Sequence, residues 1–283
     1  MITALGTLTM NLPPPPDDLM IRIGVSPALP TRDERVAVYD DVGASIYQNI
    51  RDAVTHQSGQ TVLDFGCGTG RVLRWFAAEP NLNLVGCDIH EASVAWMQAS
   101  FPPAVRLYAN GHAAPLPEAD DTFDLIYCGS VFSHLTDWAP WLLELRRILK
   151  PGGALVASLH GRGFWEEGFH GTRGVPWEED HTGMLVEHYG STFDDSWGPA
   201  VYVSEWWVRE HWGRALEIER FEPTGFGSGR LNTLLSESLG QNQALEAHIA
   251  DLHRRLSVFE NSRSWKLTRP LRSVVRQVHI AKR

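Results

Sequence analysis

The segment VLDFGCGTGR, residues 62–71, joins an apolar strand to a turn that contains three glycines. A glycine-rich turn after a strand lets the backbone approach a ligand, since a Cβ atom would occupy that space. A dinucleotide fingerprint has the spacing GxGxxG, but here Gly66, Gly68 and Gly70 alternate, so the third glycine comes one residue early. A P-loop needs Gly-Lys-Ser/Thr, and Arg71 follows instead. The segment therefore predicts another kind of ligand turn, or a tight turn of a Rossmann-like domain.

Short apolar strands alternate with helical segments along the middle of the chain. Strand patterns cover residues 61–66, 83–88, 105–110, 123–131 and 154–161, and helical patterns cover residues 71–79, 92–100 and 141–150. The alternation predicts an α/β fold, namely a Rossmann-like, doubly wound, mostly parallel seven-stranded sheet with helices on both faces. In such open sheets ligands bind beyond the carboxyl ends of the strands, so we expect the chemistry at those ends.

Composition and pattern divide the chain into four regions. Residues 1–30, with four consecutive prolines, predict a flexible leader, and residues 31–225 predict a single α/β domain. Inside that domain residues 162–203 break the alternation and predict an excursion over the acceptor side of the site. Residues 230–262 predict a coiled coil, and residues 263–283 predict a basic amphipathic tail.

The composition excludes several classes of function. The cysteines Cys67, Cys87 and Cys128 are odd in number and lack CxxC or Cys/His spacing, which argues against disulfides and against a metal site. This cysteine usage fits a reducing cytoplasm best. No apolar run is long enough to predict a segment that spans a membrane. The net charge is −9, and residues 254–283 carry a local balance of +8. The acidic remainder argues against nucleic acid as a partner.

An acidic residue at the end of the next strand completes the ligand turn. Asp88 can accept hydrogen bonds from both hydroxyls of a ribose, and Asp64 can bind a cationic amino group, which suits an aminoacyl nucleoside. The order of VLDFGCGTGR, VGCDIH, PLPEADDTFDLIYCGSVFSHL and RRILKPGGALVASLHG resembles the class I S-adenosylmethionine-dependent methyltransferases. The resemblance covers residues 60–160 closely and residues 32–223 loosely.

The resemblance implies S-adenosyl-L-methionine as the cofactor and suggests its contacts. Around the methionine part it places Asp64, Gly66, Cys67, Gly68 and Gly70. It also implies that Asp88 holds the ribose, that Ile89 faces the adenine and that Cys128 lines the cofactor through its backbone. Many relatives end the third strand in Gly-Asp-Ala, whose Asp receives the adenine amino group. Because His112 replaces that Asp here, we expect Asn110 to make the contact.

Two histidines at strand ends are candidates for catalysis. A hydroxyl acceptor of a methyl group gains from a general base, and His134 in SVFSHL or His160 in SLHG is suited to this role. For either one the alternative is a hydrogen bond to a loop carbonyl. Tryptophans between residues 165 and 212 are consistent with an aromatic acceptor pocket, although we expect Trp206, Trp207 and Trp212 to belong to the core.

A heptad pattern follows the domain. Its a positions are Leu235, Asn242, Ile249 and Leu256, and an Asn at one a position favours a parallel dimer. The alternatives are a helix folded back on the domain and pairing with a glycosyltransferase.

The end of the chain suggests an acceptor. ENSRSWKLTRPLRSVVRQVHIAKR, residues 260–283, is similar to the SxSW(K/R)LTxPLR tails that follow coiled coils in bacterial glycosyltransferases and methyltransferases of surface-polysaccharide synthesis. A cationic stretch with Trp265 and Leu271 is suited to peripheral contact with anionic lipid at the inner face of the membrane. The resemblance implies O-methylation of a saccharide or lipid-linked glycan. The alternatives are a small-molecule metabolite as the acceptor, and a cofactor-binding scaffold without turnover.

Overall fold

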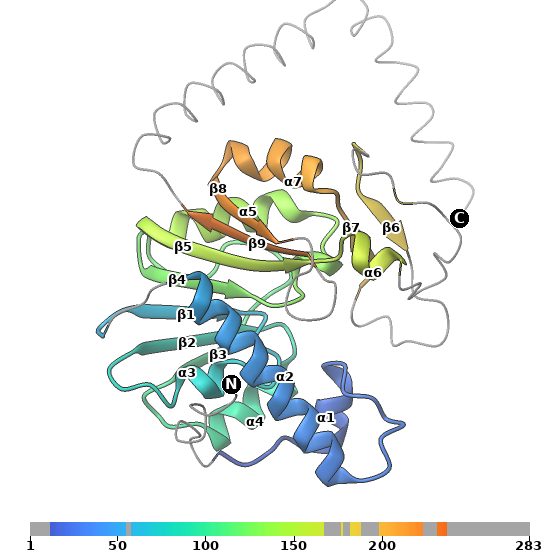
Figure 1. Ribbon diagram of the computed structural model, residues 1–283. Coiled ribbons are helices and arrows are strands. Elements are labelled where there is room, and N and C mark those ends of the chain that lie inside the picture. Colours follow the sequence, from blue (N-terminus) through green and yellow to red (C-terminus); the bar gives the residue numbers. More distant parts are fainter. Residues whose placement is uncertain are drawn as a thin grey trace, which may run out of the picture. The chain divides into compact units, whose positions relative to one another are not determined.

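A computed structural model describes the chain in several stretches (Figure 1). They are residues 12–54, 58–166, 177, 182–187, 198–222 and, for the backbone, 231–236. Contacts within the chain divide it into Met1–Ser238 and Leu239–Arg283, and the described residues all belong to the first unit. Among them no helix has the length and apolar character needed to cross a bilayer.

The centre of the first unit is a sheet of five parallel strands in the order β3-β2-β1-β4-β5. The strands are β1 (Thr61–Phe65), β2 (Asn83–Asp88), β3 (Arg106–Ala109), β4 (Phe123–Cys128) and β5 (Leu149–Leu159). Beyond β5 the backbones of β9 (Leu231–Ser236) and β8 (Glu217–Glu222) pair antiparallel. The predicted Rossmann-like arrangement is confirmed for the five parallel strands, and the loops after four of them border the cavity described below.

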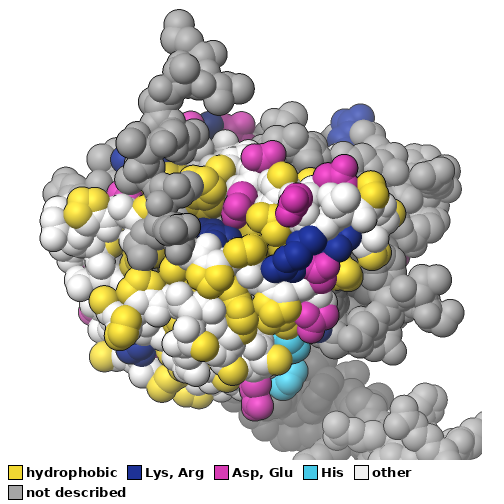
Figure 2. All heavy atoms as spheres, turned by 90° about the horizontal axis from the view of Figure 1, so that it is seen from below, with side chains coloured by type: hydrophobic (Ala, Val, Ile, Leu, Met, Phe, Trp, Pro, Cys, Tyr) yellow, Lys and Arg dark blue, Asp and Glu magenta, His cyan; other side chains and the backbone are white. Residues whose placement is uncertain are grey.

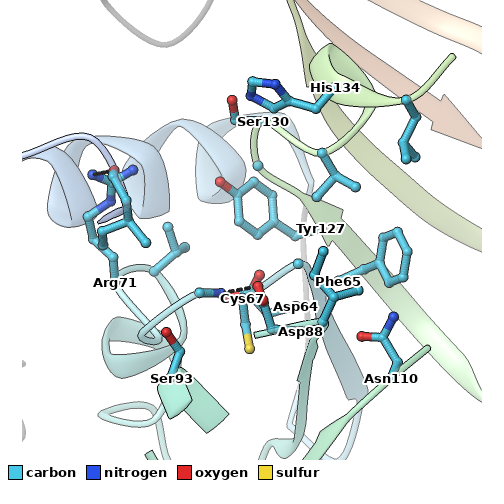
Figure 3. Close-up of a pocket in the computed structure, with 18 of the residues that line it drawn as sticks. Asp64, Phe65, Cys67, Arg71, Asp88, Ser93, Asn110, Tyr127, Ser130 and His134 are labelled. Atoms are coloured by element: carbon cyan, nitrogen blue, oxygen red, sulfur yellow. Dashed lines mark hydrogen bonds between the residues drawn. The ribbon is translucent and has the colours of Figure 1, made fainter. Parts of the chain in front are cut away.

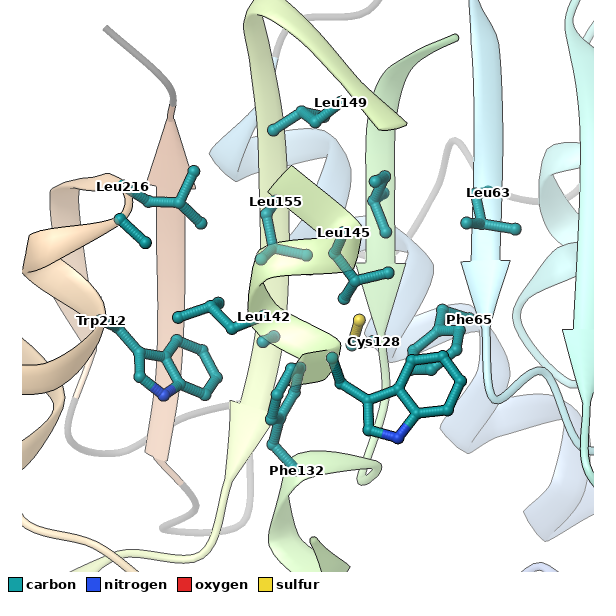
Figure 4. Packing of buried hydrophobic residues seen from close by; sticks show 14 of the residues in the cluster. Leu63, Phe65, Cys128, Phe132, Leu142, Leu145, Leu149, Leu155, Trp212 and Leu216 are labelled. Atoms are coloured by element: carbon teal, nitrogen blue, oxygen red, sulfur yellow. The ribbon is translucent and has the colours of Figure 1, made fainter. Parts of the chain in front are cut away.

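Helices cover both faces of the sheet, because alternate side chains of each buried strand point to opposite faces. On one face Leu63 and Phe65 of β1 pack with α5 (Trp138–Ile148) and α7 (Glu205–His211), as Figure 4 shows in part. On the other face Val62 packs with α2 (Arg32–Ala53), α3 (Leu73–Phe76) and α4 (Glu91–Ser100). The sheet therefore lies between two apolar cores.

The prediction of a flexible leader over residues 1–30 is wrong for the part that the structure describes. Helix α1 (Asp17–Arg22) buries Met20 against Val25 and Tyr39. The Arg74 guanidinium of α3 donates hydrogen bonds to the carbonyls of residues 12 and 13, at 2.7 and 3.2 Å. Buried apolar side chains and arginine donors thus attach this segment to the domain. Figure 2 shows the face that carries α1, where hydrophobic and charged side chains are interspersed.

The region after β5 is described only in part. It contains α6 (Arg162–Glu166), β6 (Leu185–Glu187) and β7 (Ala200–Tyr202), with β6 and β7 paired antiparallel. Trp207 and Trp212 are buried as expected, but Trp206 is 41% exposed, so its assignment to the core was wrong.

The predicted coiled coil begins too early in the sequence. Residues 231–236, which include the first a position, Leu235, form strand β9. The backbone of this strand pairs with β5 on one side and β8 on the other, which satisfies groups that an edge of the sheet would leave open. The rest of the predicted coiled coil and the basic tail, residues 237–283, lies outside the described residues.

Candidate functional site

A cavity of about 520 Å³ lies at the carboxyl ends of the parallel strands (Figure 3). Much of its polar lining comes from the carboxyl ends of β1, β2 and β4 and from the loops after β1, β2, β3 and β4, as expected for an open parallel sheet. Of the predicted residues it is lined by Asp64, Gly66, Cys67, Gly68, Asp88, Ile89, Asn110 and His134. Gly70, Cys128 and His160 are not among the residues that line it.

The glycine turn owes its shape to contacts within the protein. The N–H groups of Gly66 and Cys67 both donate to the carbonyl of Cys87, at 2.9 and 3.0 Å. Gly66 has a φ of +74°, and a Cβ atom there would lie 2.2 Å from Cγ2 of Val131. At Gly70 a Cβ atom would instead press on Phe101 and Met97 behind the turn. These two glycines therefore serve backbone conformation and packing, which keeps the backbone of the turn against the cavity.

The Asp88 carboxylate is held in a fixed orientation at the end of β2. Its Oδ2 accepts a hydrogen bond from the Gly68 N–H at 2.7 Å (Figure 3), and its Oδ1 accepts one from the His90 N–H at 2.8 Å. Each oxygen of a carboxylate has a further lone pair, so both can still accept from a ligand. Ile89 lies beside it with 40% of its surface exposed. This end of the cavity is suited to a vicinal diol with an apolar group next to it.

Asp64 is the most deeply buried acid of the cavity, with 4% of its surface exposed. Burial raises the pKa of its carboxyl to about 8, the negative charge of Asp88 adds to the rise, and the positive charge of Arg71 opposes it. A neutral carboxyl of this kind becomes a carboxylate when a cation binds beside it. Asp64 is therefore suited to an ammonium group.

Asn110 places a hydrogen-bond acceptor on the wall of the cavity, where a ligand can reach it. Its Nδ2 donates to the carbonyl of Gly111 at 2.8 Å, whereas its buried Oδ1 has no partner among the described residues. Buried polar atoms are nearly always paired, so an orphaned acceptor on a cavity wall indicates a donor on the ligand. An exocyclic amino group of a purine is such a donor. His112 also lines the cavity.

The two candidate histidines have different surroundings. His134 lines the cavity, and its Nδ1 lies 3.1 Å from the carbonyl oxygen of Pro199. Because a carbonyl only accepts, Nδ1 carries the proton and Nε2 of the neutral ring is the basic nitrogen. His160 is 4% exposed and its ring stacks on Phe164 at 4.0 Å, outside the lining of the cavity. The geometry favours His134 and gives His160 a role in packing.

The cysteines are thiols without nucleophilic character. Burial raises the pKa of Cys67 and of Cys128 well above the ordinary value, and the charge of Asp64 adds to the rise. Cys128 is fully buried and lies in the core beneath α5 (Figure 4). Its expected contact with a cofactor is therefore not supported by the lining of the cavity.

Several residues of the cavity were missed in the sequence. Arg71 follows the last glycine of the turn and Tyr127 is the penultimate residue of β4, so both positions near strand ends could have indicated the site. Ser130, which has a φ of +59°, also lines the cavity. Arg22 and Ile23 reach the cavity from the N-terminal segment, and nothing in the local sequence indicates this contact.

Comparisons with known proteins bear on the same region of the chain. Residues 63–157 match the profile of a family described as methyltransferase domain. The 2-methyl-6-phytyl-1,4-hydroquinone methyltransferase of Synechocystis sp. is 36% identical over 101 residues, which cover 35% of this chain and 32% of that protein. A malonyl-[acyl-carrier protein] O-methyltransferase of Dechloromonas aromatica is 30% identical over 178 residues, which cover 61% of this chain and 62% of that protein.

The likeness in fold extends further than the likeness in sequence. A chain from the complex that contains the Trm112 methyltransferase activator of Haloferax volcanii superposes with a TM-score of 0.55 at 17% identity. The match covers 73% of this chain and 95% of that one. In contrast, the chain spans about a third to three fifths of the length of the two curated relatives above.

Proposed function

Since residues 63–157 form an S-adenosylmethionine-dependent methyltransferase domain, we propose that the whole chain transfers the methyl group of S-adenosylmethionine to an oxygen atom of an acceptor. The observation that carries the proposal is the fixed Asp88 carboxylate, which shares one cavity with the buried Asp64 and with the Oδ1 of Asn110, which has no partner in the described part of the chain. These three groups match a ribose diol, an ammonium and an adenine amino group. When bound, the cofactor would supply a methyl group on a sulfonium sulfur, and the neutral thioether S-adenosylhomocysteine would be the leaving group.

Each residue of the cofactor end has a role in binding under this proposal. Asp88 accepts hydrogen bonds from the ribose hydroxyls, and Ile89 covers the adenine face. Asp64 pairs with the amino group as a carboxylate, and Asn110 accepts from the adenine amine through Oδ1. The backbone of residues 66–68 borders the methionine part. Binding and alignment of this kind contribute most of the acceleration in a displacement reaction, since they bring the reacting atoms together.

His134 is the residue that we propose as the general base. Its Nδ1–H is oriented by the carbonyl of Pro199, so Nε2 is the nitrogen that takes a proton from an acceptor hydroxyl. A methyl group can be transferred without a base, and removing a positioned base lowers the rate by about 10²–10⁴-fold. Replacing His134 with Ala should therefore reduce kcat while the affinity for the cofactor stays unchanged.

For the acceptor class we propose a saccharide or a lipid-linked glycan. Support comes from the resemblance of residues 260–283 to tails found in polysaccharide synthesis. We also propose that residues 237–262 bind a partner, which is either a second copy of this chain or a glycosyltransferase. In the same proposal the basic tail makes peripheral contact with the inner face of the membrane. The names of the two relatives favour the alternative, since they refer to a hydroquinone and to malonyl on a carrier protein.

Formation of S-adenosylhomocysteine over a panel of acceptors tests the proposal. The panel comprises free sugars, undecaprenyl-linked sugars, hydroquinones and acyl thioesters, each incubated with the full chain and with His134→Ala. Turnover on a sugar supports the glycan proposal, and turnover on the other acceptors alone replaces it with the metabolite alternative. Cofactor binding without turnover on any class would favour the scaffold.

A further inference from the structure

Arg71 is a guanidinium on the wall of the cavity for which the proposed function has so far given no role. It directly follows the glycine turn, and its Nη1 donates a hydrogen bond to the carbonyl of Ile23 at 3.2 Å. Its position is fixed from behind by α2, because a Cβ atom at Gly43 would lie 2.3 Å from the carbonyl oxygen of Arg71 and 3.1 Å from its Cγ. The tight contact holds the base of this side chain against the helix.

The charge of Arg71 lacks a direct counter-ion in the part of the chain that the structure describes. No carboxylate among the described residues forms an ion pair with Arg71, although Asp64 acts on it through the cavity. Burial lowers the pKa of the guanidinium, which nevertheless remains charged in proteins. A guanidinium offers five N–H donors, and the bond to Ile23 uses one. A largely buried cation with unused donors, directed along a cavity wall, is suited to a carboxylate.

We propose that Arg71 binds the α-carboxylate of S-adenosylmethionine, so that Arg71 and Asp64 together recognise the two opposite charges of its amino-acid end. The inference rests on the proposed function, because it assumes that the methionine part lies against residues 64–71. Arg22 is the second guanidinium of the cavity, but it comes from the last turn of α1, outside the turn that carries Asp64. Arg71 is thus a specificity-determining residue for the cofactor.

Two cofactor analogues separate this role from a structural one. Calorimetric titration compares S-adenosylmethionine with decarboxylated S-adenosylmethionine on the full chain, and 5′-methylthioadenosine, which lacks the amino-acid end, is the reference. For the unmodified protein we expect decarboxylated S-adenosylmethionine to bind about 10- to 100-fold more weakly, the worth of a charge-assisted bond. In Arg71→Gln the two affinities should become equal, whereas binding of methylthioadenosine should be unchanged.

Arg22→Gln is the matched control, since it removes the same charge from the same cavity. It should keep the preference for the carboxylated ligand, and Arg71→Lys should keep part of it. Equal binding of the two ligands by the unmodified protein would overturn the inference without any variant. The inference would also be overturned if Arg71→Gln weakened all three ligands alike, or if Arg22→Gln alone removed the preference.

If the proposed function itself is wrong, the same titrations give a different result. In that case the unmodified protein binds none of the three ligands, or Asp88→Ala binds them as well as the unmodified protein does. If Asp88→Ala weakens all three and Arg71→Gln leaves the preference intact, the cofactor site stands and Arg71 serves another ligand, such as an anionic acceptor.

Discussion

At the scale of single residues, the site places two carboxyl groups in one cavity and gives them different environments. Asp88 accepts two backbone hydrogen bonds in fixed directions, whereas Asp64 is buried and protonated at neutral pH. A carboxyl that stays neutral until a cation arrives avoids most of the free-energy cost of a buried charge in the free protein. The difference allows one cavity to bind both a diol and an ammonium.

The raised pKa of Asp64 predicts how stability depends on pH. Because the folded state holds this proton up to about pH 8, its contribution to stability is complete below about pH 4 and is lost progressively as the pH rises to about 8. Within this pH range the contribution of Asp64 to the free energy of unfolding falls by up to about 1.4 kcal/mol per pH unit. Asp64→Asn should flatten the melting temperature between pH 5 and pH 8 in the absence of ligand. Thermal unfolding of both proteins measures this, and parallel pH profiles would contradict the assignment.

The backbone of the glycine turn predicts how an added methyl group at Gly66 changes the stability of the protein. Gly66→Ala combines a φ of +74° with an overlap against Val131, so we expect a loss of roughly 1–3 kcal/mol in the free energy of unfolding. Gly111→Ala is the control, because no atom lies within 4 Å of its added Cβ. Urea unfolding of the two variants gives the comparison. Equal stabilities would mean that the turn is not built as described.

At the scale of secondary structure elements, helix α5 shows how the sheet is held beneath the site. Its Leu145 is fully buried in the core (Figure 4), Trp141 belongs to the same buried cluster, and Leu143 is 50% exposed. The strong amphipathic pattern of this helix was readable in the sequence, since apolar residues recur at helical spacing. The 3-10 helix Phe132–His134, which ends a few residues before α5, places His134 on the wall of the cavity.

The two leucines of α5 make a matched pair for a stability measurement. Leu145→Ala should lower the free energy of unfolding by about 2–5 kcal/mol, since it removes buried methyl groups and leaves a cavity. Leu143→Ala should change it by no more than about 0.5 kcal/mol. Chemical unfolding of the two variants tests the orientation of the helix. A larger loss for Leu143→Ala would show that the helix is turned the other way.

At the scale of the whole molecule, the charge of the chain is divided between an acidic body and a basic end. The net charge of −9 conceals the local balance of +8 over residues 254–283. Basic residues near an anionic surface contribute about 1 kcal/mol each, and salt weakens the attraction.

This division predicts binding to membranes by the tail. The full chain should sediment with vesicles that contain phosphatidylglycerol and stay in solution with phosphatidylcholine vesicles. A chain truncated after Phe259 should lose this binding and keep its affinity for the cofactor. Retention of vesicle binding after truncation would rule out the tail as the contact.

The sequence predicted the residues at the strand ends of the cavity better than those that reach it from distant segments. Asp64 and Asp88 end neighbouring parallel strands, and such ends meet at one edge of the sheet, so local order was enough. Arg22 arrives from a segment interpreted as a flexible leader, and its contact depends on packing between distant residues. His160 ends a strand as well, yet stacking on Phe164 holds it away from the cavity. Strand pairing likewise decided the structure at Leu235 against the heptad spacing.

Calorimetric titration of S-adenosylmethionine into the full chain tests the central claim most directly. We predict saturable binding with one site, a loss of affinity of at least about tenfold in Asp88→Ala, and unchanged affinity in Asp120→Ala, whose side chain is 74% exposed. Absence of binding to the unmodified chain, or equal affinity in Asp88→Ala, would contradict the account.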